Sequence, residues 1–230
     1  VTTIDENSTS IKTILDAAKS HGIKTIGIQH GTIHELHPAY IYTKKDIERR
    51  IIPDHTLVWG SHWKEFLVNK GNYPAESIEI TGQIRTDIIP VLKQKKLKPE
   101  FGKDKKIIVF ASQPQRDEAL RKRAAYDIFS SVKDMEDTLL IVKLHPAEKN
   151  DVHYYESIAK EAGCGNFKII ALIDLYYLIS VSELLITCFS TVGAETAYFN
   201  KPLIILDHLE QDIQGYYREG IALRATDKSE

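Results

Sequence analysis

Several side chains that could do chemistry stand directly after short apolar runs of this sequence. His30, Gly31 and Thr32 follow the run 24–28, and the glycine permits a sharp turn at that point. Of the three nearby histidines, His30 alone sits directly at the end of the predicted strand, where it can act as a general base or position a substrate. His30 is therefore the candidate catalytic base, and Gly31 and Thr32 are secondary candidates.

A second imidazole stands at a proline turn after the run 138–143. The order of residues is Lys143-Leu144-His145-Pro146, and a proline stops a strand and keeps the residue before it extended. His145 can donate to a phosphate oxygen from this position, and Lys143 beside it is a secondary candidate. A lone His-Pro pair is also a common structural turn, so both interpretations stay open.

The segment 190–195 has the features of a phosphate site. Ser190 and Thr191 can cap the helix that follows, and Gly193 leaves room for a close backbone approach. The N–H groups at the start of such a helix favour a phosphate. Glu195, four residues after Thr191, can accept two hydrogen bonds from a ribose diol. An ordinary helix cap is the alternative interpretation of the same residues.

Two more polar residues, Gln113 and Asp207, follow predicted strands and are secondary candidates for the same site. A metal site is not expected. His30, His34 and His37 have the spacing i, i+4, i+7, but the acidic partner that a metalloprotease helix needs is missing.

Short β-branched runs alternate with amphipathic stretches, which is the pattern of strand–helix–strand units around a parallel sheet. The predicted strands are 1–4, 24–28, 55–59, 77–81, 106–111, 138–143, 167–171, 184–187 and 203–206. The predicted helices are 8–21, 63–70, 117–132, 152–162, 174–181 and 192–199. In open parallel sheets a ligand binds beyond the carboxyl ends of the strands, which is where the candidate residues stand.

The polar, lysine-rich segment 93–102 shows no periodic apolar face and predicts a linker between two lobes. Residues 1–92 then form an N-terminal Rossmann-like lobe, and residues 103–230 form a C-terminal one. Four strands are predicted before the linker and five after it. The lysines of the linker and the run Arg121-Lys122-Arg123 are interpreted as solvated surface charges.

The composition excludes several classes of protein. The 230 residues hold 30 Lys+Arg and 32 Asp+Glu, a formal net charge of -2, whereas a nucleic-acid binder usually carries a basic surplus. No apolar run approaches the roughly 20 residues of a membrane helix. Cys164 and Cys188 lack the number and spacing of a disulfide framework, so reduced cytoplasmic thiols are expected. Since the only methionine is Met135 and the chain begins at Val1, we expect a piece of a longer protein.

Taken together, these motifs resemble the GT-B superfamily, in which two Rossmann-like lobes hold a nucleotide-activated donor between them. The turn KLHP (143–146) and the block TCFSTVGAE (187–195) resemble the donor half of capsule and teichoic-acid polymerases, which include CDP-glycerol glycerophosphotransferases and polysialyltransferase-like enzymes. The strings IGIQHGT (26–32), DHTLVWG (54–60) and ITGQIRTD (80–87) fit the same group. The block 187–195 is similar, more distantly, to the Ser-Gly-Gly-x-x-Glu region of UDP-N-acetylglucosamine 2-epimerases.

The resemblance implies an acceptor-side first lobe, a donor-binding second lobe and a role for each candidate residue. Since a GT-B acceptor lobe normally has about as many strands as the donor lobe, it also implies that the first lobe is incomplete. His145 would contact the donor phosphates, Glu195 would hold the ribose, and His30 would face the acceptor. The pyrophosphate would lie on Ser190, Thr191 and the backbone at Val192 and Gly193.

The implied reaction moves a sugar or polyol-phosphate group from a CDP-, UDP- or CMP-linked donor to a polysaccharide or lipid-linked acceptor. No cofactor or metal is obligatory in such a reaction, and no nucleic acid takes part. The implied location is the cytoplasm, at the inner face of the membrane, with peripheral membrane association of the full-length protein.

Two other functions stay open at this point. A sugar isomerase similar to the UDP-N-acetylglucosamine 2-epimerases would need acidic residues in the first lobe, where Glu35, Asp54 and Asp87 stand near predicted strand ends. A non-catalytic nucleotide-binding module of a larger protein would bind a nucleotide without turnover.

Overall fold

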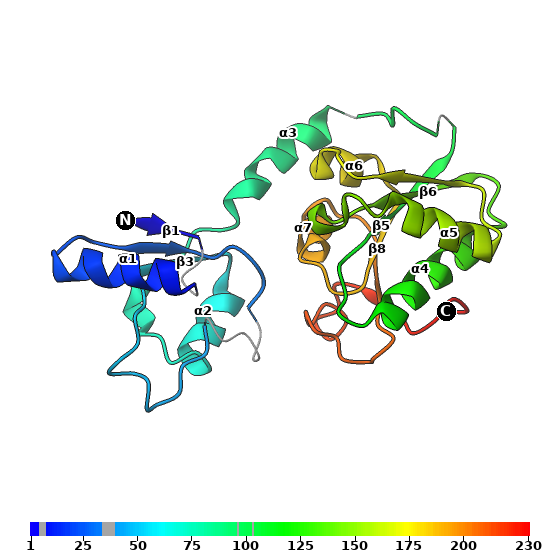
Figure 1. Ribbon diagram of the computed structural model, residues 1–230. Coiled ribbons are helices and arrows are strands. Elements are labelled where there is room, and N and C mark those ends of the chain that lie inside the picture. Colours follow the sequence, from blue (N-terminus) through cyan, green and yellow to red (C-terminus); the bar gives the residue numbers. More distant parts are fainter. Residues whose placement is uncertain (5–7, 34–39, 96, 103) are drawn as a thin grey trace. The chain divides into compact units, whose positions relative to one another are not determined.

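The computed structural model describes residues 1–4, 8–33, 40–95, 97–102 and 104–230 (Figure 1). Contacts divide the chain into two compact units, Val1–Asp87 and Ile88–Glu230. Each unit is built on a parallel sheet flanked by helices. The predicted α/β class with parallel sheets is therefore confirmed.

The described residues of the first unit form a four-stranded parallel sheet in the order β1-β2-β3-β4. Its elements are β1 (Thr2–Thr3), α1 (Thr9–Ser20), β2 (Ile26–Ile28), β3 (His55–Val58), α2 (Ser61–Asn69), the 3₁₀ turn η1 (Ala75–Ser77), β4 (Ile78–Ile80) and the 3₁₀ turn η2 (Ile84–Ile88). In the register, Gly27 lies opposite Thr56, and Thr56 lies opposite Ile78. The four strands predicted for this half are confirmed.

Helix α1 shows how the local sequence sets the bounds of an element. The Ser8 hydroxyl oxygen accepts a hydrogen bond from the Ile11 N–H at 3.3 Å, which caps the first turn. Leu15 and Ala18 form the buried face. Gly22 follows the helix with a φ of 67°, a left-handed conformation that glycine adopts without strain.

The described residues of the second unit form a six-stranded parallel sheet in the order β10-β9-β8-β5-β6-β7. Its strands are β5 (Lys106–Ala111), β6 (Thr138–Lys143), β7 (Phe167–Ile170), β8 (Leu184–Thr187), β9 (Leu203–Leu206) and β10 (Leu223–Ala225). Its helices are α3 (Ile89–Gln94), α4 (Glu118–Val132), the 3₁₀ turn η3 (Pro146–Glu148), α5 (Val152–Ala162), α6 (Leu175–Val181) and α7 (Val192–Tyr198).

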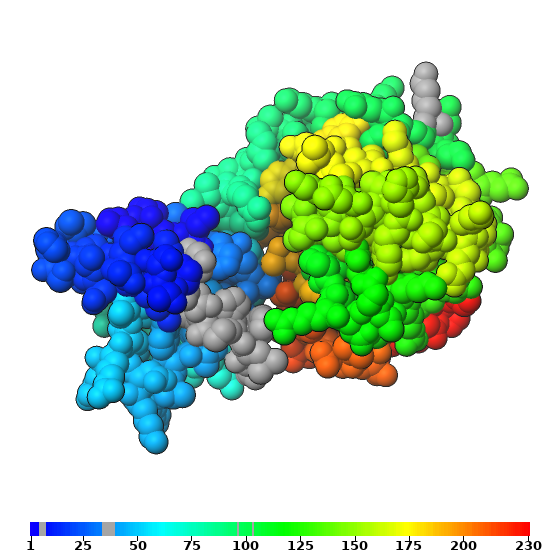
Figure 2. Space-filling model, viewed as in Figure 1, coloured from blue at the N-terminus to red at the C-terminus, as the bar shows by residue number. Residues whose placement is uncertain are grey.

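Both faces of this sheet are covered, because successive side chains of a strand point to opposite sides. In β5, Ile107 and Val109 pack on the α6 side, whereas Phe110 packs with α4 and α5. Figure 2 shows α4 and α5 together on the surface of this unit. The sheet is therefore the middle of three layers, and its strand ends are the part left for a ligand.

The predicted linker 93–102 packs on the second unit in its described part. Helix α3 buries Ile89 in the core cluster that also holds α6, and the Lys93 Nζ donates to the Tyr198 carbonyl at 2.8 Å. The Tyr177 hydroxyl accepts from the Glu100 N–H at 2.8 Å and donates to the Lys98 carbonyl at 3.1 Å. The contacts thus place the division of the chain at Asp87, before α3.

Candidate functional site

The order of strands in the second unit marks where a ligand can enter. The chain runs from β5 outward through β6 and β7, then returns to place β8 on the other side of β5. Ligands of open parallel sheets bind at such a reversal, beyond the carboxyl ends of the strands. Ser112 and His145 follow β5 and β6 at this edge, and Ser190 follows β8.

The His145 side chain is exposed and fixed by its own turn. Its Nδ1 accepts a hydrogen bond from the Ala147 N–H at 3.1 Å, at the start of η3. A neutral imidazole that accepts at Nδ1 carries its proton on Nε2. The geometry therefore leaves an Nε2–H donor at the edge of the sheet, which could donate to an anion. The backbone N–H of His145 donates to the Ser112 Oγ at 3.2 Å, which ties this turn to the end of β5.

A buried carboxylate holds the His145 turn from behind. Glu148 is 2% exposed, and its Oε2 accepts from the Ser112 hydroxyl at 2.5 Å. Its Oε1 accepts from the Tyr155 hydroxyl at 3.0 Å and from the Arg121 Nε at 2.7 Å. Burial raises the pKa of Tyr155 to about 12, so its hydroxyl remains a donor at neutral pH. The carboxylate is thus fully bonded, as a buried charge must be.

Arg121 is the cation of this network, and interpreting it as a solvated charge was wrong. Its side chain is only 12% exposed, and its Nη2 also contacts the Asp151 Oδ2 at 2.5 Å. Its guanidinium carbon lies 4.2 Å from the centroid of the Tyr154 ring. The neighbours in the run behave as surface charges, since Lys122 pairs with Glu161 at 2.9 Å and both side chains are half exposed. Sequence reasoning missed Glu148 and Arg121, because their pairing joins α4 to a turn 27 residues away.

The start of α7 is shaped by Ser190 and Tyr216. The Val192 N–H donates to the Ser190 Oγ at 3.3 Å, and the Gly193 N–H donates to the Ser190 carbonyl at 3.1 Å. Thr191 is the N-cap, and its side chain makes no cap hydrogen bond. A Cβ at Gly193 would lie 2.5 Å from the Tyr216 ring. The close approach that requires glycine here is therefore made by Tyr216.

Glu195 lies one turn into α7 and is 2% exposed. The Tyr176 hydroxyl donates to its Oε1 at 3.3 Å. Burial is also the main cause that raises the pKa of Tyr216, and the nearby Glu195 charge acts in the same direction. Glu195 thus stands behind the Ser190 turn, among tyrosines.

The side chains of three secondary candidates form hydrogen bonds within the protein. The Gln113 Oε1 accepts from the Phe189 N–H at 2.8 Å and from the Thr187 hydroxyl at 3.2 Å, which joins the ends of β5 and β8. The Lys143 Nζ donates to the Leu144 and Ala171 carbonyls, and burial lowers its pKa. The Asp207 carboxylate accepts from the N–H groups of Gln211 and Asp212 and caps the turn after β9.

A cavity of about 60 Å³ lies where β8 and β9 end. Its walls are Gln115, Leu120, Cys188, Phe189, Leu206, Asp207, His208, Leu209, Gln211 and Ile213. Burial raises the pKa of Cys188 to about 12, so its thiol stays protonated and is no nucleophile at neutral pH.

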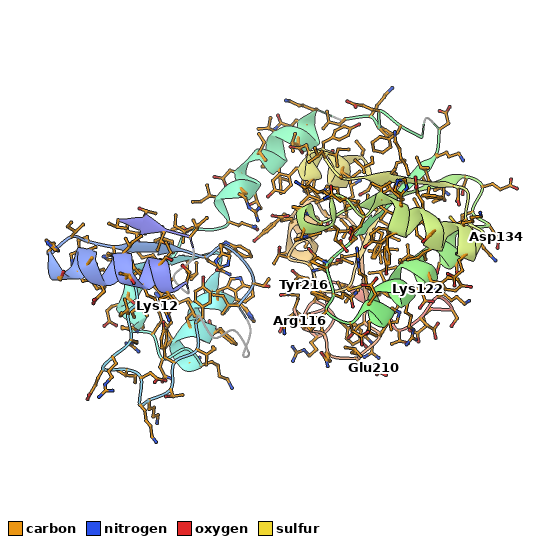
Figure 3. The ribbon with its side chains drawn as sticks, in the orientation of Figure 1. Lys12, Arg116, Lys122, Asp134, Glu210 and Tyr216 are labelled. Atoms are coloured by element: carbon orange, nitrogen blue, oxygen red, sulfur yellow. The ribbon has the colours of Figure 1, made fainter. Side chains whose placement is uncertain are left out.

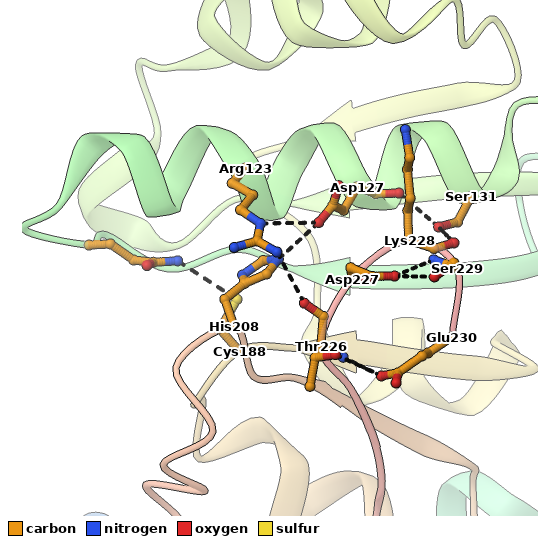
Figure 4. Close-up of polar contacts among 11 residues, drawn as sticks. Arg123, Asp127, Ser131, Cys188, His208, Thr226, Asp227, Lys228, Ser229 and Glu230 are labelled. Atoms are coloured by element: carbon orange, nitrogen blue, oxygen red, sulfur yellow. Dashed lines mark hydrogen bonds and ion pairs between the residues drawn. The ribbon is translucent and has the colours of Figure 1, made fainter.

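His208 lines this cavity and is held in place by Asp127, a residue that does not line it. Its Nε2 lies 3.0 Å from the Asp127 Oδ2 of α4 (Figure 4). Arg123 approaches the same carboxylate oxygen at 3.7 Å, and its Nη2 donates to the Thr226 carbonyl at 3.5 Å. The pair therefore fixes the end of β9 to α4 and to the last residues of the chain.

In the first unit, His30 stands exposed at the carboxyl end of β2. The Tyr40 hydroxyl lies 3.5 Å from its Nδ1, and the two rings are stacked with centroids 6.5 Å apart. Gln29, which is 3% exposed, fixes the turn: its Nε2 donates to the Gly31 carbonyl at 2.9 Å, and its Oε1 accepts from the Trp59 N–H at 2.9 Å. Thr32 is 6% exposed, so it supports the turn from inside.

The first unit also contains the histidines and acids that could bind a metal or transfer a proton. His34, His37 and Glu35 lie outside the described residues. Among the residues that the structure describes, no group of three or more His, Cys, Asp or Glu could hold a metal ion. Asp54 precedes β3 and binds the N–H and hydroxyl of Thr25, both at 2.8 Å, at the amino end of the sheet. Asp54 is therefore at the opposite edge from His30.

Comparison with solved structures shows that the fold of this chain is similar to that of several known proteins. The S. aureus MnaA–UDP co-structure matches 99% of this chain and 63% of its own length, with 16% identity and a TM-score of 0.69. A UDP-GlcNAc 2-epimerase from Neisseria meningitidis bound to UDP-GlcNAc matches 96% of this chain and 62% of its own, with 16% identity and a TM-score of 0.67. The wall teichoic acid polymerase TagF matches 90% and 57%, with 16% identity and a TM-score of 0.59.

These neighbours confirm the GT-B-like fold, and the chain spans about three fifths of their length. No curated protein matches the sequence. Among the described residues, no helix has the length and apolar character needed to cross a membrane. The model of the family described as CDP-Glycerol:Poly(glycerophosphate) glycerophosphotransferase matches residues 9–219, which include both histidine turns. This chain therefore belongs to the CDP-glycerol:poly(glycerophosphate) glycerophosphotransferase family.

Proposed function

We propose that this chain provides the donor site and an acceptor-side lobe of a transferase that moves glycerol phosphate from CDP-glycerol to a poly(glycerophosphate) acceptor. The observation that carries the proposal is the family match over residues 9–219 together with the His145 turn, whose geometry leaves an Nε2–H donor at the sheet edge. The topology of the second unit favours a ligand at that edge. A donor phosphate there would receive a hydrogen bond from His145.

The proposed reaction is a displacement at the phosphorus atom next to glycerol. The acceptor hydroxyl oxygen forms a bond to this phosphorus, and the bond from phosphorus to the oxygen that bridges the two phosphates breaks. CMP leaves with the bridging oxygen, and the acceptor proton passes to the His30 imidazole. His145, with the Ser190 hydroxyl, stabilises the negative charge on the phosphates.

We also propose a role for Glu195, a class of acceptor and a location, none of which follows from the family match alone. Glu195 would take the ribose hydroxyls of the donor, with Tyr176 as its present partner. The acceptor would be lipid-linked, and the full-length protein would work at the inner face of the membrane.

Titration with CDP tests the donor site. We expect CDP to raise the unfolding temperature of the chain, because a ligand that binds only the folded state stabilises it. His145→Ala should weaken CDP binding by about 1.5–3 kcal/mol, the value of a hydrogen bond to a charged group, or roughly ten- to a hundredfold. His153→Ala is the matched control, since His153 is an exposed histidine that pairs with Glu156 on the surface of α5. An unchanged affinity in folded His145→Ala would remove His145 from the donor site.

A sugar isomerase is the second candidate, favoured by the higher TM-score of the UDP-GlcNAc 2-epimerase from Neisseria meningitidis, 0.67, than of TagF, 0.59. The position of Asp54 argues against it, because this acid is bound to Thr25 at the wrong edge of the sheet. Release of free N-acetylmannosamine from UDP-N-acetylglucosamine would reverse the order of the two proposals. CDP binding with no turnover by the full-length protein would favour a non-catalytic module.

A further inference from the structure

A pocket of about 200 Å³ lies in the first unit between α1 and the segment that follows Tyr40. Its walls are Lys12, Tyr42, Asp46, Arg49, Arg50 and Ile51, and these residues are called the basic pocket below. Lys12 projects from α1 in Figure 3. Among the residues that the structure describes, the walls hold three cations and one carboxylate, a net charge of +2. None of these residues belongs to the donor site described above.

The charges of the basic pocket are not neutralised by the described part of the protein. Within those residues, neither Lys12 nor Arg49 forms an ion pair; the Lys12 ammonium lies 5.7 Å from the centroid of the Tyr42 ring. Arg50 donates through Nη1 to the carbonyl oxygen of Asn72, which leaves its positive charge uncompensated.

The one acid of the basic pocket is occupied by its own turn. The Asp46 Oδ2 accepts from the Thr43 N–H at 2.9 Å and from the Thr43 hydroxyl at 2.5 Å. These hydrogen bonds lower the pKa of Asp46, so it stays ionised but faces Thr43. The excess of positive charge around a hollow favours an anion. Proteins commonly bind phosphate groups through the guanidinium of arginine and the ammonium of lysine.

The basic pocket is joined to the His30 turn by a short piece of chain. Tyr40 stacks on His30, and Tyr42, two residues later, lines the pocket. Two residues of chain span at most about 7 Å. A flexible polymer whose terminal hydroxyl lies at His30 can therefore place a phosphate further along its chain in the pocket.

We propose that the basic pocket binds a phosphate group of the phosphodiester polymer that accepts glycerol phosphate. This inference rests on the proposed function for the identity of the polymer, whereas the preference for a phosphate rests on the residues of the pocket. A pocket with converging cations suits a discrete phosphate of a polymer better than the plane of a membrane. The pocket would bind the growing polymer at a phosphate a short distance from the terminal hydroxyl that reacts.

The test compares two double substitutions of equal charge. Lys12→Gln with Arg49→Gln removes two charges from the pocket, and Lys44→Gln with Lys45→Gln removes two charges from exposed side chains of the same segment outside it. Arg50 is left unchanged because it supports the Asn72 backbone. Binding of purified poly(glycerophosphate), inorganic phosphate and vesicles of anionic phospholipid is measured separately by calorimetry, on the folded chain.

We expect the pocket variant to bind the polymer about tenfold more weakly and to show a smaller dependence of affinity on salt, by about one to two in the log–log slope. The control variant should lose less than threefold, and CDP affinity should be unchanged in both. Equal losses in the two variants, or binding only to vesicles or only to inorganic phosphate, would overturn the proposal. Absence of CDP binding and turnover with pocket-dependent polymer binding would instead contradict the proposed function alone.

Discussion

Ser112→Ala removes the hydroxyl that joins the His145 turn to the buried Glu148. That hydroxyl donates to the Glu148 Oε2 at 2.5 Å and accepts from the His145 N–H at 3.2 Å. A hydrogen bond to a charged group contributes about 1.5–3 kcal/mol and a neutral one about 0.5–1.5 kcal/mol, so the variant should lose roughly 2–4 kcal/mol of unfolding free energy. CDP affinity should also fall, because the His145 imidazole is no longer held at the sheet edge.

A double-mutant cycle separates positioning from a general loss of stability. If Ser112 acts on CDP only through His145, Ser112→Ala should weaken binding markedly in the wild-type chain and have no further effect in His145→Ala. Ser112→Thr keeps a hydroxyl and should restore most of the CDP affinity. Ser182→Ala is the control: its hydroxyl is also buried and donates to the Ile179 carbonyl at 2.9 Å, but before β8, at the amino end of the sheet.

Calorimetric titration with CDP and urea unfolding of the same variants provide the two measurements. Losses of CDP affinity that simply add in Ser112→Ala with His145→Ala would refute the reasoning, since independent effects mean that the serine does not position the histidine. An equal loss of CDP affinity in Ser182→Ala would show that stability alone sets the affinity.

Two further predictions concern stability. Hydrogen bonds from Thr25 and the charge of Lys19 outweigh the effect of burial and lower the pKa of Asp54 from 3.8 to about 2, so the folded state favours the ionised carboxylate. Asp54→Ala should therefore cost about 1–2 kcal/mol at neutral pH, and urea unfolding should show this difference disappear as the pH falls from 4 toward 2; a difference independent of pH would contradict the assignment. Gly193→Ala places a Cβ 2.5 Å from the Tyr216 ring and should lower the unfolding free energy by about 1–3 kcal/mol, which thermal unfolding can measure; no loss would show that the ring moves away freely.

The fold could be predicted from the sequence where apolar runs end sharply at polar residues. Strands β5, β6, β8 and β9 have the predicted bounds, because β-branched runs with sharp ends at polar residues mark buried parallel strands. Strand β10 was not predicted, since it has three residues at the sheet edge and its Leu223 is 71% exposed. In the residues that the structure describes, the first unit has four strands, as predicted, and the second has six instead of five.

The candidate site was predictable only in part. Residues after strands, such as His30 and His145, could be found because parallel topology places the carboxyl ends of the strands at one edge of each sheet. Their supports could not, because the neutralisation of a buried carboxylate is a tertiary property. Arg121 stands in a basic run and Glu148 in a turn, and neither local pattern shows that the two side chains are buried together.

In each unit, a glutamine side chain accepts a hydrogen bond from a backbone N–H that follows a strand. A loop that presents a reactive side chain at the end of a strand has backbone groups without a ladder partner. The Gln29 Oε1 takes the Trp59 N–H after β3, and the Gln113 Oε1 takes the Phe189 N–H after β8. A carboxamide does this without a buried charge, whose desolvation would be costly. The turns that carry His30 and Ser190 are therefore held by hydrogen bonds within the protein, so the binding of a ligand at either turn would not have to order it.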